Sequence, residues 1–129
     1  MIIANLTNSS LKNGEILTGR SALSYYNLGC SCDPRVIMVI GDVDHDIYYE
    51  PLWVIPREDN FEFAILDNGY RIATVNQALY HTFLYDYDYS CIYELLETID
   101  EEMLNNFIIW LQETDRYNSI SDKLESYEI

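Results

Sequence analysis

The chain has 129 residues, of which 49% are hydrophobic, and this length and composition are typical of one folded domain rather than of a disordered segment. Its 22 acidic and 7 basic residues give a formal net charge of −15. Such a charge repels nucleic acid and anionic membranes and attracts basic protein surfaces, so neither direct nucleic-acid binding nor membrane binding is expected.

The first part of the chain is expected to supply a strand, a loop and a helix. Residues 1–17 are predicted to form the N-terminal edge strand and the loop. A helix should begin at Thr18 or Gly19, where apolar residues start to recur with helical spacing. It should end at Gly29, since glycine readily takes the left-handed conformation that closes a helix. The residues expected to face inward are Ala22, Leu23, Tyr26 and Leu28.

Two more strands are predicted next. Residues 36–40 are apolar and mostly β-branched, which is the pattern of a strand covered on both faces. Residues 47–55 are expected to form the second strand, in which Pro51 marks a bulge or a sheet edge.

A tight hairpin is predicted around Asn68-Gly69, because this dipeptide tolerates the positive φ angles of such a turn. Residues 61–66 should therefore pair antiparallel with residues 70–73. Thr74 is expected to open a helix through a capping box. In that motif its hydroxyl accepts from a backbone N–H three residues on, while the Gln77 side chain reaches back to the Thr74 N–H.

The C-terminal part is predicted to be helical. Ser90 is the expected cap of a helix over residues 91–98, and Asp100 of the last long helix. Residues 118–129 are expected to form a frayed tail of one or two helical turns. The elements together predict an α+β fold in a single domain, residues 1–129. It has a small antiparallel sheet of about four strands, flanked by an N-terminal helix and two to three C-terminal helices.

Catalytic motifs are absent from the sequence, so neither an enzyme nor a cofactor is expected. The sharpest chemical candidate is the alternation of Asp42, Asp44 and Asp46, whose carboxylates could hold a divalent cation. A calcium loop of the EF-hand type is excluded because Ile47 and Trp53 occupy its sixth and twelfth positions. A metal-dependent enzyme built on Asp42 and Asp44 stays an alternative, but the other parts of a two-metal site are missing.

The cysteines indicate a reducing compartment. Cys30, Cys32 and Cys91 are odd in number, and Cys30-Ser31-Cys32 is too short for a relaxed disulfide. With only His45 and His81 as further soft ligands, a zinc site is not expected. The chain shows neither a signal peptide nor an apolar run long enough to span a membrane, so a cytoplasmic protein is expected.

Two rows of carboxylates suggest a binding surface. Carboxylates two residues apart on an extended chain lie ~6.6–7 Å apart, a spacing of the same order as that of backbone phosphates. Tyrosines alternate with the second row, and their rings can stack on arginine guanidinium groups. The first row is Asp42, Asp44, Asp46 and Glu50; the second is Tyr85, Asp86, Tyr87, Asp88 and Tyr89.

Residues 17–23 (LTGRSAL), with Tyr26 and Leu28, resemble a helix of the abortive-infection type IV antitoxins. Residues 68–74 (NGYRIAT) and the following Gln77-Ala78-Leu79 are similar to the strand, cap and helix that come later in that family. The resemblance implies a non-catalytic domain that acts against another protein. The family's winged-helix DNA-binding part has no counterpart here, which removes operator binding from what is implied. The acidic character is also similar to that of phage-encoded inhibitors that mimic DNA.

Two hypotheses follow for a chain that binds a basic protein. In the first, it is an acidic inhibitor that mimics nucleic acid and occupies the basic groove of a defence nuclease, of the anti-CRISPR or anti-restriction type. In the second, it neutralises a nucleotidyltransferase-type toxin through apolar contacts made by Trp110 and residues 117–129. The identity of the partner and the oligomeric state stay open.

Overall fold

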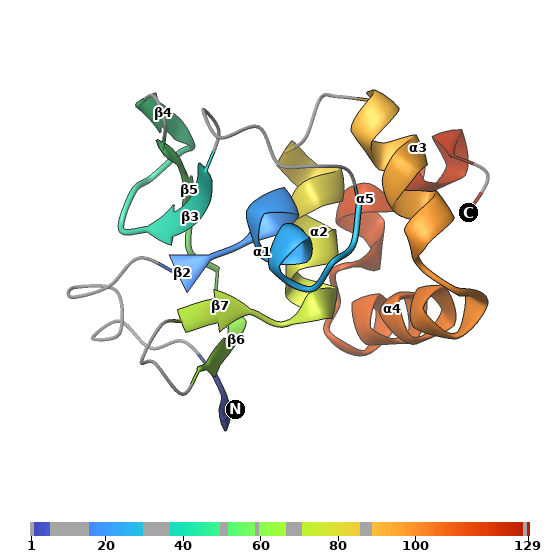
Figure 1. The fold of residues 1–129 in the computed structure, drawn as a ribbon, viewed down its shortest axis with the longest axis horizontal. Helices are drawn as coiled ribbons and strands as arrows, with labels where there is room; N and C mark the ends of the chain where they lie inside the picture. Colours follow the sequence, from blue (N-terminus) through green and yellow to red (C-terminus); the bar gives the residue numbers. More distant parts are fainter. Residues whose placement is uncertain are drawn as a thin grey trace.

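The computed structural model describes residues 2–5, 16–29, 37–49, 52–58, 60–66, 71–85, 89–127 and 129. Its elements in chain order are β1 (Ile2–Asn5), β2 (Ile16–Leu17), α1 (Gly19–Tyr25), β3 (Ile37–Gly41), β4 (Ile47–Tyr49), β5 (Leu52–Pro56), β6 (Glu62–Ile65), β7 (Arg71–Ala73), α2 (Val75–Tyr85), α3 (Tyr89–Thr98), α4 (Glu101–Glu113) and α5 (Tyr117–Ser126). The expected α+β class is therefore confirmed (Figure 1).

The strands form one mixed sheet of seven, in the order β1-β6-β7-β2-β3-β5-β4. Strand β2 runs parallel to β7 and β3 runs parallel to β5, whereas the other neighbours are antiparallel. The expectation of about four antiparallel strands is thus wrong in number and in direction. Strands β2 and β4 carry two and three residues, too few to show a strand period, and parallel pairs join segments that a sequence pattern does not connect.

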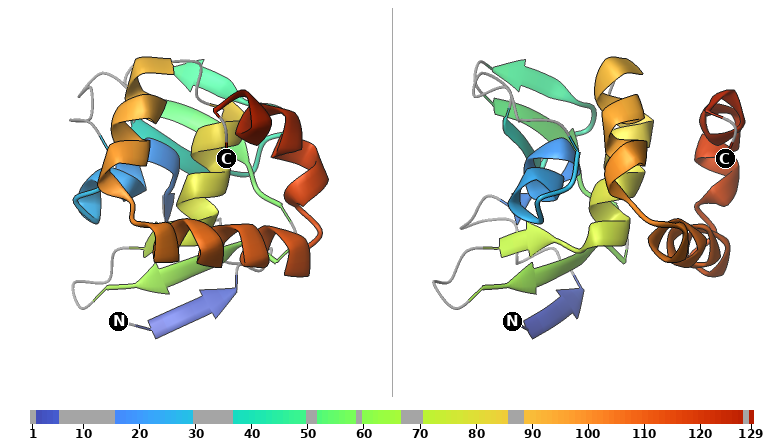
Figure 2. Two further views of the ribbon diagram at one scale, coloured as in Figure 1. Left: turned by 90° about the vertical axis from the view of Figure 1, so that its right-hand side faces the viewer. Right: turned by 45° about the vertical axis from the view of Figure 1, so that its right-hand side comes forward.

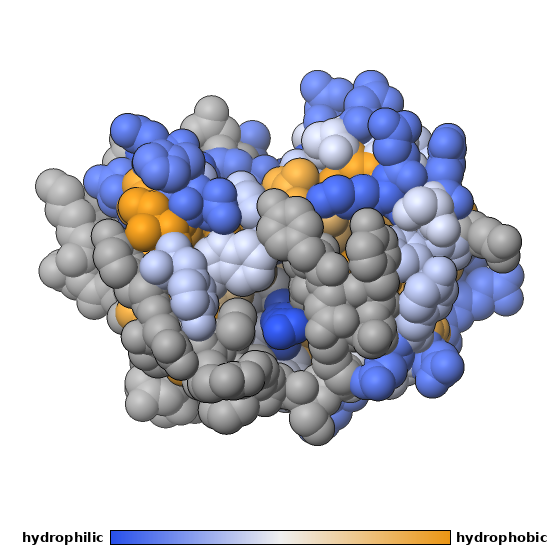
Figure 3. Space-filling view, turned by 90° about the horizontal axis from the view of Figure 1, so that it is seen from above, coloured by the Kyte–Doolittle hydropathy of each residue, from blue (hydrophilic) through white to orange (hydrophobic). Residues whose placement is uncertain are grey.

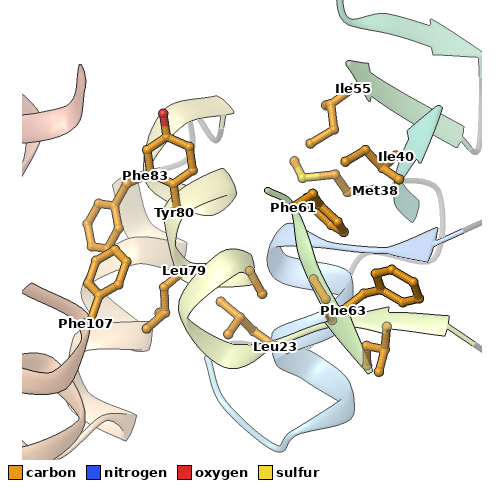
Figure 4. Close-up of a cluster of buried hydrophobic side chains, with 14 of the residues drawn as sticks. Leu23, Met38, Ile40, Ile55, Phe61, Phe63, Leu79, Tyr80, Phe83 and Phe107 are labelled. Atoms are coloured by element: carbon orange, nitrogen blue, oxygen red, sulfur yellow. The ribbon is translucent and has the colours of Figure 1, made fainter. Parts of the chain in front are cut away.

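Helix α2 is the centre of the molecule. Seven consecutive residues, from Gln77 to Phe83, are buried, which requires packing on more than one side. On one side lie the strands, with Met38, Ile40, Ile55 and Phe61 (Figure 4). On the other side Phe83 stacks on Phe107 of α4, with ring centroids 6.0 Å apart and planes 18° apart (Figure 4). Helices α4 and α5 thus lie on the far side of α2 from the sheet (Figure 2).

Several local predictions are confirmed. Strands β6 and β7 pair antiparallel with Phe63 opposite Ala73, as expected for the hairpin, while its turn, residues 67–70, lies outside the described residues. Asp100 caps α4, because its Oδ1 accepts from the Met103 N–H at 2.8 Å. The expected end of the first helix at Gly29 is wrong: α1 ends at Tyr25, and Asn27, with φ +61°, is the left-handed residue that follows it, although Gly29 also has a positive φ of +82°. Strand β1 lies at a sheet edge, and the consecutive residues Met38, Val39 and Ile40 of β3 are all buried, as expected for a strand covered on both faces.

Two predictions of strand and cap are wrong. Residues 47–55 are a hairpin of β4 and β5 rather than one strand, with Pro51 outside the described residues. The capping box at Thr74 does not form, since the Thr74 N–H donates to the Glu62 carbonyl at 3.2 Å. The Thr74 hydroxyl is buried without a hydrogen-bond partner among the described residues. Gln77 bonds Glu62 and Glu58 instead, because the end of β5 and the start of β6 lie beside it.

The C-terminal expectations also change. Helix α3 already begins at Tyr89, so Ser90 is not its cap but lies inside the first turn. The residues expected as a frayed tail belong to the ten-residue helix α5. Its Ile120 and Leu124 are buried, and α5 packs against α2. Burial of this apolar stripe, which polar neighbours hide in the sequence, stabilises the helix to its end.

Candidate functional site

The first carboxylate row lies on the connection between β3 and β4. Because β5 separates these two strands in the sheet, residues 42–46 pass over the end of β5, where Gly41 pairs with Pro56. The side chains of Asp42, Asp44 and Asp46 are all exposed. Three of the four predicted residues of this row therefore share one exposed connection, and the fourth, Glu50, lies outside the described residues.

Trp53 fixes this connection to the sheet. Its Nε1–H donates to Asp46 Oδ2 at 3.1 Å, and Trp53 pairs across the β4–β5 hairpin with Tyr48, whose side chain is 53% exposed. Neither aromatic residue was predicted as part of the site. Their proximity depends on the reversal between β4 and β5, in a segment where the sequence pattern predicts a single strand.

Trp53 also connects the two predicted rows. Its ring lies edge-on to the ring of Tyr85, with centroids 6.4 Å apart and planes 76° apart. Tyr85 is the last residue of α2 and the first of the second row. The next three residues of that row, Asp86, Tyr87 and Asp88, lie outside the described residues. Tyr89 is the first residue of α3.

We use the term acid–aromatic surface for two sets of residues. The contacts above bring together Asp46, Tyr48, Trp53 and Tyr85, and Asp42 and Asp44 share the exposed β3–β4 connection with Asp46. In the view from above, hydrophilic residues gather over the end of the molecule formed by β3–β5 and also over the C-terminal helices (Figure 3).

The acidic character is not confined to the predicted rows. The C-terminal helices and the turns between them carry a second group of exposed carboxylates, none of which was predicted as part of a binding surface: Glu94, Glu97, Asp100, Glu101, Glu102, Glu113, Asp115, Asp122 and Glu125. The two basic residues of this region, Arg116 and Lys123, are turned to partners inside the fold. Arg116 Nε donates to Glu58 Oε2 at 3.2 Å, and Lys123 Nζ donates to the Leu84 carbonyl at 2.7 Å.

Next to Tyr85, whose ring centroid is 5.9 Å from that of His81, lies a polar group that we call the His81 cluster. It consists of the buried residues Thr18, Gln77, His81 and Arg116 and of Glu58, whose side chain is 27% exposed. His81 Nδ1 lies 2.6 Å from the Thr18 hydroxyl oxygen, and His81 Nε2 lies 3.3 Å from Gln77 Nε2 and 3.5 Å from Glu58 Oε1. Gln77 Nε2 also donates to Glu58 Oε1. The cluster therefore joins the start of α1, the β5–β6 connection, α2 and the α4–α5 turn.

The charge states of the cluster follow from burial and neighbours. Burial lowers the pKa of His81, the hydrogen bond and the charge of Glu58 oppose this effect, and the nearby Arg116 adds to it. Burial by itself raises the pKa of Glu58, but the hydrogen bond and charge that His81 supplies when its imidazole is protonated, the charge of Arg116 and the hydrogen bond from Gln77 outweigh it, so the pKa of Glu58 is lowered. The favoured state is a neutral His81 beside an ionised Glu58 that pairs with Arg116.

The hydroxyl, imidazole and carboxylate of Thr18, His81 and Glu58 are arranged in the order of a nucleophile and its activating groups. The Thr18 side chain is 0% exposed and His81 is 2% exposed, so a substrate has no path to this hydroxyl. We therefore assign a structural rather than a catalytic role to the His81 cluster.

Within the described ranges, no three His, Cys, Asp or Glu side chains are grouped as a metal ion needs.

The apolar surface of the second hypothesis is largely used inside the fold. The Trp110 ring stacks on Phe107, with centroids 6.3 Å apart, and its Nε1–H donates to Glu62 Oε2 at 2.5 Å. In the tail, Ile120 and Leu124 are buried.

Across the described part of the chain, none of the helices has the length and apolarity to cross a membrane.

No family model, curated protein or solved structure matches this chain. The resemblance to the abortive-infection type IV antitoxins therefore stays a prediction from the residues that carry it.

Proposed function

We propose that the chain is a non-catalytic acidic protein that binds the basic, nucleic-acid-binding groove of another protein and thereby inhibits it. The observation that carries the proposal is the contact of Asp46 with Trp53 and of Trp53 with Tyr85. It joins two stretches about forty residues apart, each chosen for its carboxylates or tyrosines, into the acid–aromatic surface.

The chemistry of this surface suits arginine. Exposed carboxylates attract the guanidinium charge, and the exposed Tyr48 beside them carries a ring of the kind on which its plane stacks. The same combination already holds a guanidinium inside the chain, where Arg116 pairs with Glu58 and lies 4.7 Å from the Trp110 ring centroid. Grooves that bind nucleic acid are rich in arginine and lysine, so a defence nuclease of the CRISPR or restriction type is the partner class that we propose.

Binding of an arginine-rich peptide tests the charge and the site together. The affinity of a nine-residue arginine peptide is measured by fluorescence anisotropy over a series of salt concentrations. We expect the affinity to fall steeply with salt, since ions screen exposed charges. The double substitution D42N/D44N removes two exposed carboxylates, each worth about 0.2–1 kcal/mol in such a pair, and should weaken binding about 2- to 30-fold at low salt.

The matched control removes the same charge elsewhere. Glu113 and Glu125 are exposed on α4 and α5, so E113Q/E125Q changes the net charge by the same two units. We expect this variant to bind the peptide nearly as well as the unchanged chain. Equal losses for both double variants would show that only the net charge is read, and would contradict the acid–aromatic surface. Binding insensitive to salt would instead favour apolar docking, as in the antitoxin-like hypothesis.

A further inference from the structure

The His81 cluster contains a partly buried ion pair, with Arg116 buried and the Glu58 side chain 27% exposed, that joins two layers of the fold. Glu58 lies on the connection from β5 to β6, and Arg116 lies in the turn between α4 and α5. Besides its bond to Glu58 Oε2, Arg116 donates from Nη2 to the Asn60 carbonyl at 3.2 Å. These bonds connect the β5–β6 connection directly to the turn of the C-terminal helices, and we call them the Glu58–Arg116 clasp.

Hydrogen bonds fix which nitrogen of His81 is free to take a proton. Gln77 Oε1 accepts from the Glu62 N–H at 3.3 Å, so its amide nitrogen must face Glu58 and His81 Nε2 as a donor. A neutral His81 therefore accepts at Nε2 and donates from Nδ1–H to the Thr18 hydroxyl. The lone pair on Nε2, 3.5 Å from Glu58 Oε1, is the site for an added proton.

Four parts of the fold place groups against His81. They are the residue before α1 (Thr18), the β5–β6 connection (Glu58 and Phe61), α2 itself (Gln77, Tyr80 and Tyr85) and the α4–α5 turn (Arg116). Of these, Glu58 and Arg116 carry charge near neutral pH. A proton on His81 thus places a second cation beside a carboxylate that Arg116 already neutralises. The Gln77 N–H and the new imidazolium N–H then also point at each other.

We propose that the His81 cluster is a proton-operated clasp. A proton from solvent binds His81 Nε2, the imidazolium pairs with Glu58 Oε1 and repels the Arg116 guanidinium held at Oε2, and the α4–α5 turn loosens from the β5–β6 connection while the sheet and α2 stay folded. Arg116 is the member that can leave, because it lies in a turn next to Asp115, which has φ +59°, whereas His81 lies inside α2. The proposal is independent of the proposed function, since its steps involve contacts within the chain alone.

The indole of Trp110 reports on the clasp. The Cζ atom of Arg116 lies 4.7 Å from the centroid of the Trp110 ring. The Trp110 Nε1–H donates to the Glu62 carboxylate, and the Glu62 backbone N–H in turn donates to Gln77. The chain has two histidines and two tryptophans, so each side chain can be assigned by replacing its counterpart. His45 is exposed in the β3–β4 connection, which makes H45Q the matched control for H81Q. W53F assigns the Trp110 signal.

The experiment is an NMR titration of the full chain from about pH 8 down to about pH 5, following the histidine Cε1–H and indole N–H signals. We expect the Trp110 indole signal to shift or broaden with the midpoint of His81 while the backbone amide signals of the sheet stay dispersed. H45Q should retain this transition, and H81Q should lose it. The wild-type titration decides by itself if H81Q does not fold.

Three results overturn the proposal. In the first, His81 does not titrate in this range, or titrates without any response of Trp110. In the second, the Trp110 transition persists in H81Q. In the third, the amide signals of the sheet collapse together with the Trp110 signal, which identifies global unfolding instead of a local release.

Discussion

Gly19 is the position at which one added methyl group should destabilise the fold most clearly. Its φ is +55°, and a Cβ placed there would lie 2.1 Å from the sulfur of Met38. The left-handed conformation costs a non-glycine residue about 1–2 kcal/mol. Met38 is completely buried, so its displacement adds overpacking of about 1–3 kcal/mol. We therefore expect Gly19→Ala to lower the free energy of unfolding by about 2–5 kcal/mol.

Gly29 supplies the matched control for this substitution. Its φ is +82°, but an added Cβ would meet Leu95 at an ordinary 3.5 Å. Gly29→Ala should therefore carry only the conformational cost, about 1–2 kcal/mol. Urea unfolding followed by circular dichroism measures both variants. Equal losses of stability in the two variants would refute the steric part of the reasoning.

Three further predictions concern stability. Phe107→Ala should lower the free energy of unfolding, measured with urea, by about 3–5 kcal/mol. Ile109→Ala, on the exposed face of the same helix, should lower it far less, and similar losses in the two variants would contradict the packing of α4 on α2. Folding lowers the pKa of His81, so below pH 6.5 the unfolded chain binds more protons than the folded chain. The free energy of unfolding should therefore fall as the pH drops below 6.5, and His81 accounts for at most about 1.4 kcal/mol per pH unit. The H81Q substitution should make this dependence on pH less steep. The lowered pKa of Glu58 adds a second loss below pH 4.5, and stability that rises on acidification would contradict both assignments. Lys123→Met removes the cation that donates to the Leu84 carbonyl at the C-terminal end of α2, and it should lower the free energy of unfolding by about 0.3–1 kcal/mol, measured by thermal unfolding. An unchanged stability would contradict this contribution of Lys123.

Local signals in the sequence were sufficient for part of the fold. The Asn68-Gly69 turn predicted the β6–β7 hairpin, and Asp100 was identified as a helix cap because both signals act over a few residues. The position of β2 between β7 and β3 depends on contacts between distant segments, which no local period encodes. The reversal between β4 and β5 was missed because both strands are rich in apolar residues.

The candidate site divides in the same way. The exposure of Asp42, Asp44 and Asp46 follows from their place in a polar connection, so the sequence could predict it. The contact of Trp53 with Tyr85 could not be predicted, since it requires knowing how α2 lies against the sheet. The His81 cluster was likewise hidden, because its members come from four separate segments and each residue alone has an ordinary sequence context.

The central claim is that the acid–aromatic surface occupies a groove that otherwise holds nucleic acid. The most direct measurement is displacement of fluorescent DNA from a purified guide-dependent or restriction nuclease by increasing amounts of the chain. The account predicts displacement that weakens with salt, is reduced in D42N/D44N and is retained in E113Q/E125Q. Failure to displace DNA from nucleases of either type, or displacement that D42N/D44N performs as well as the unchanged chain, would contradict it.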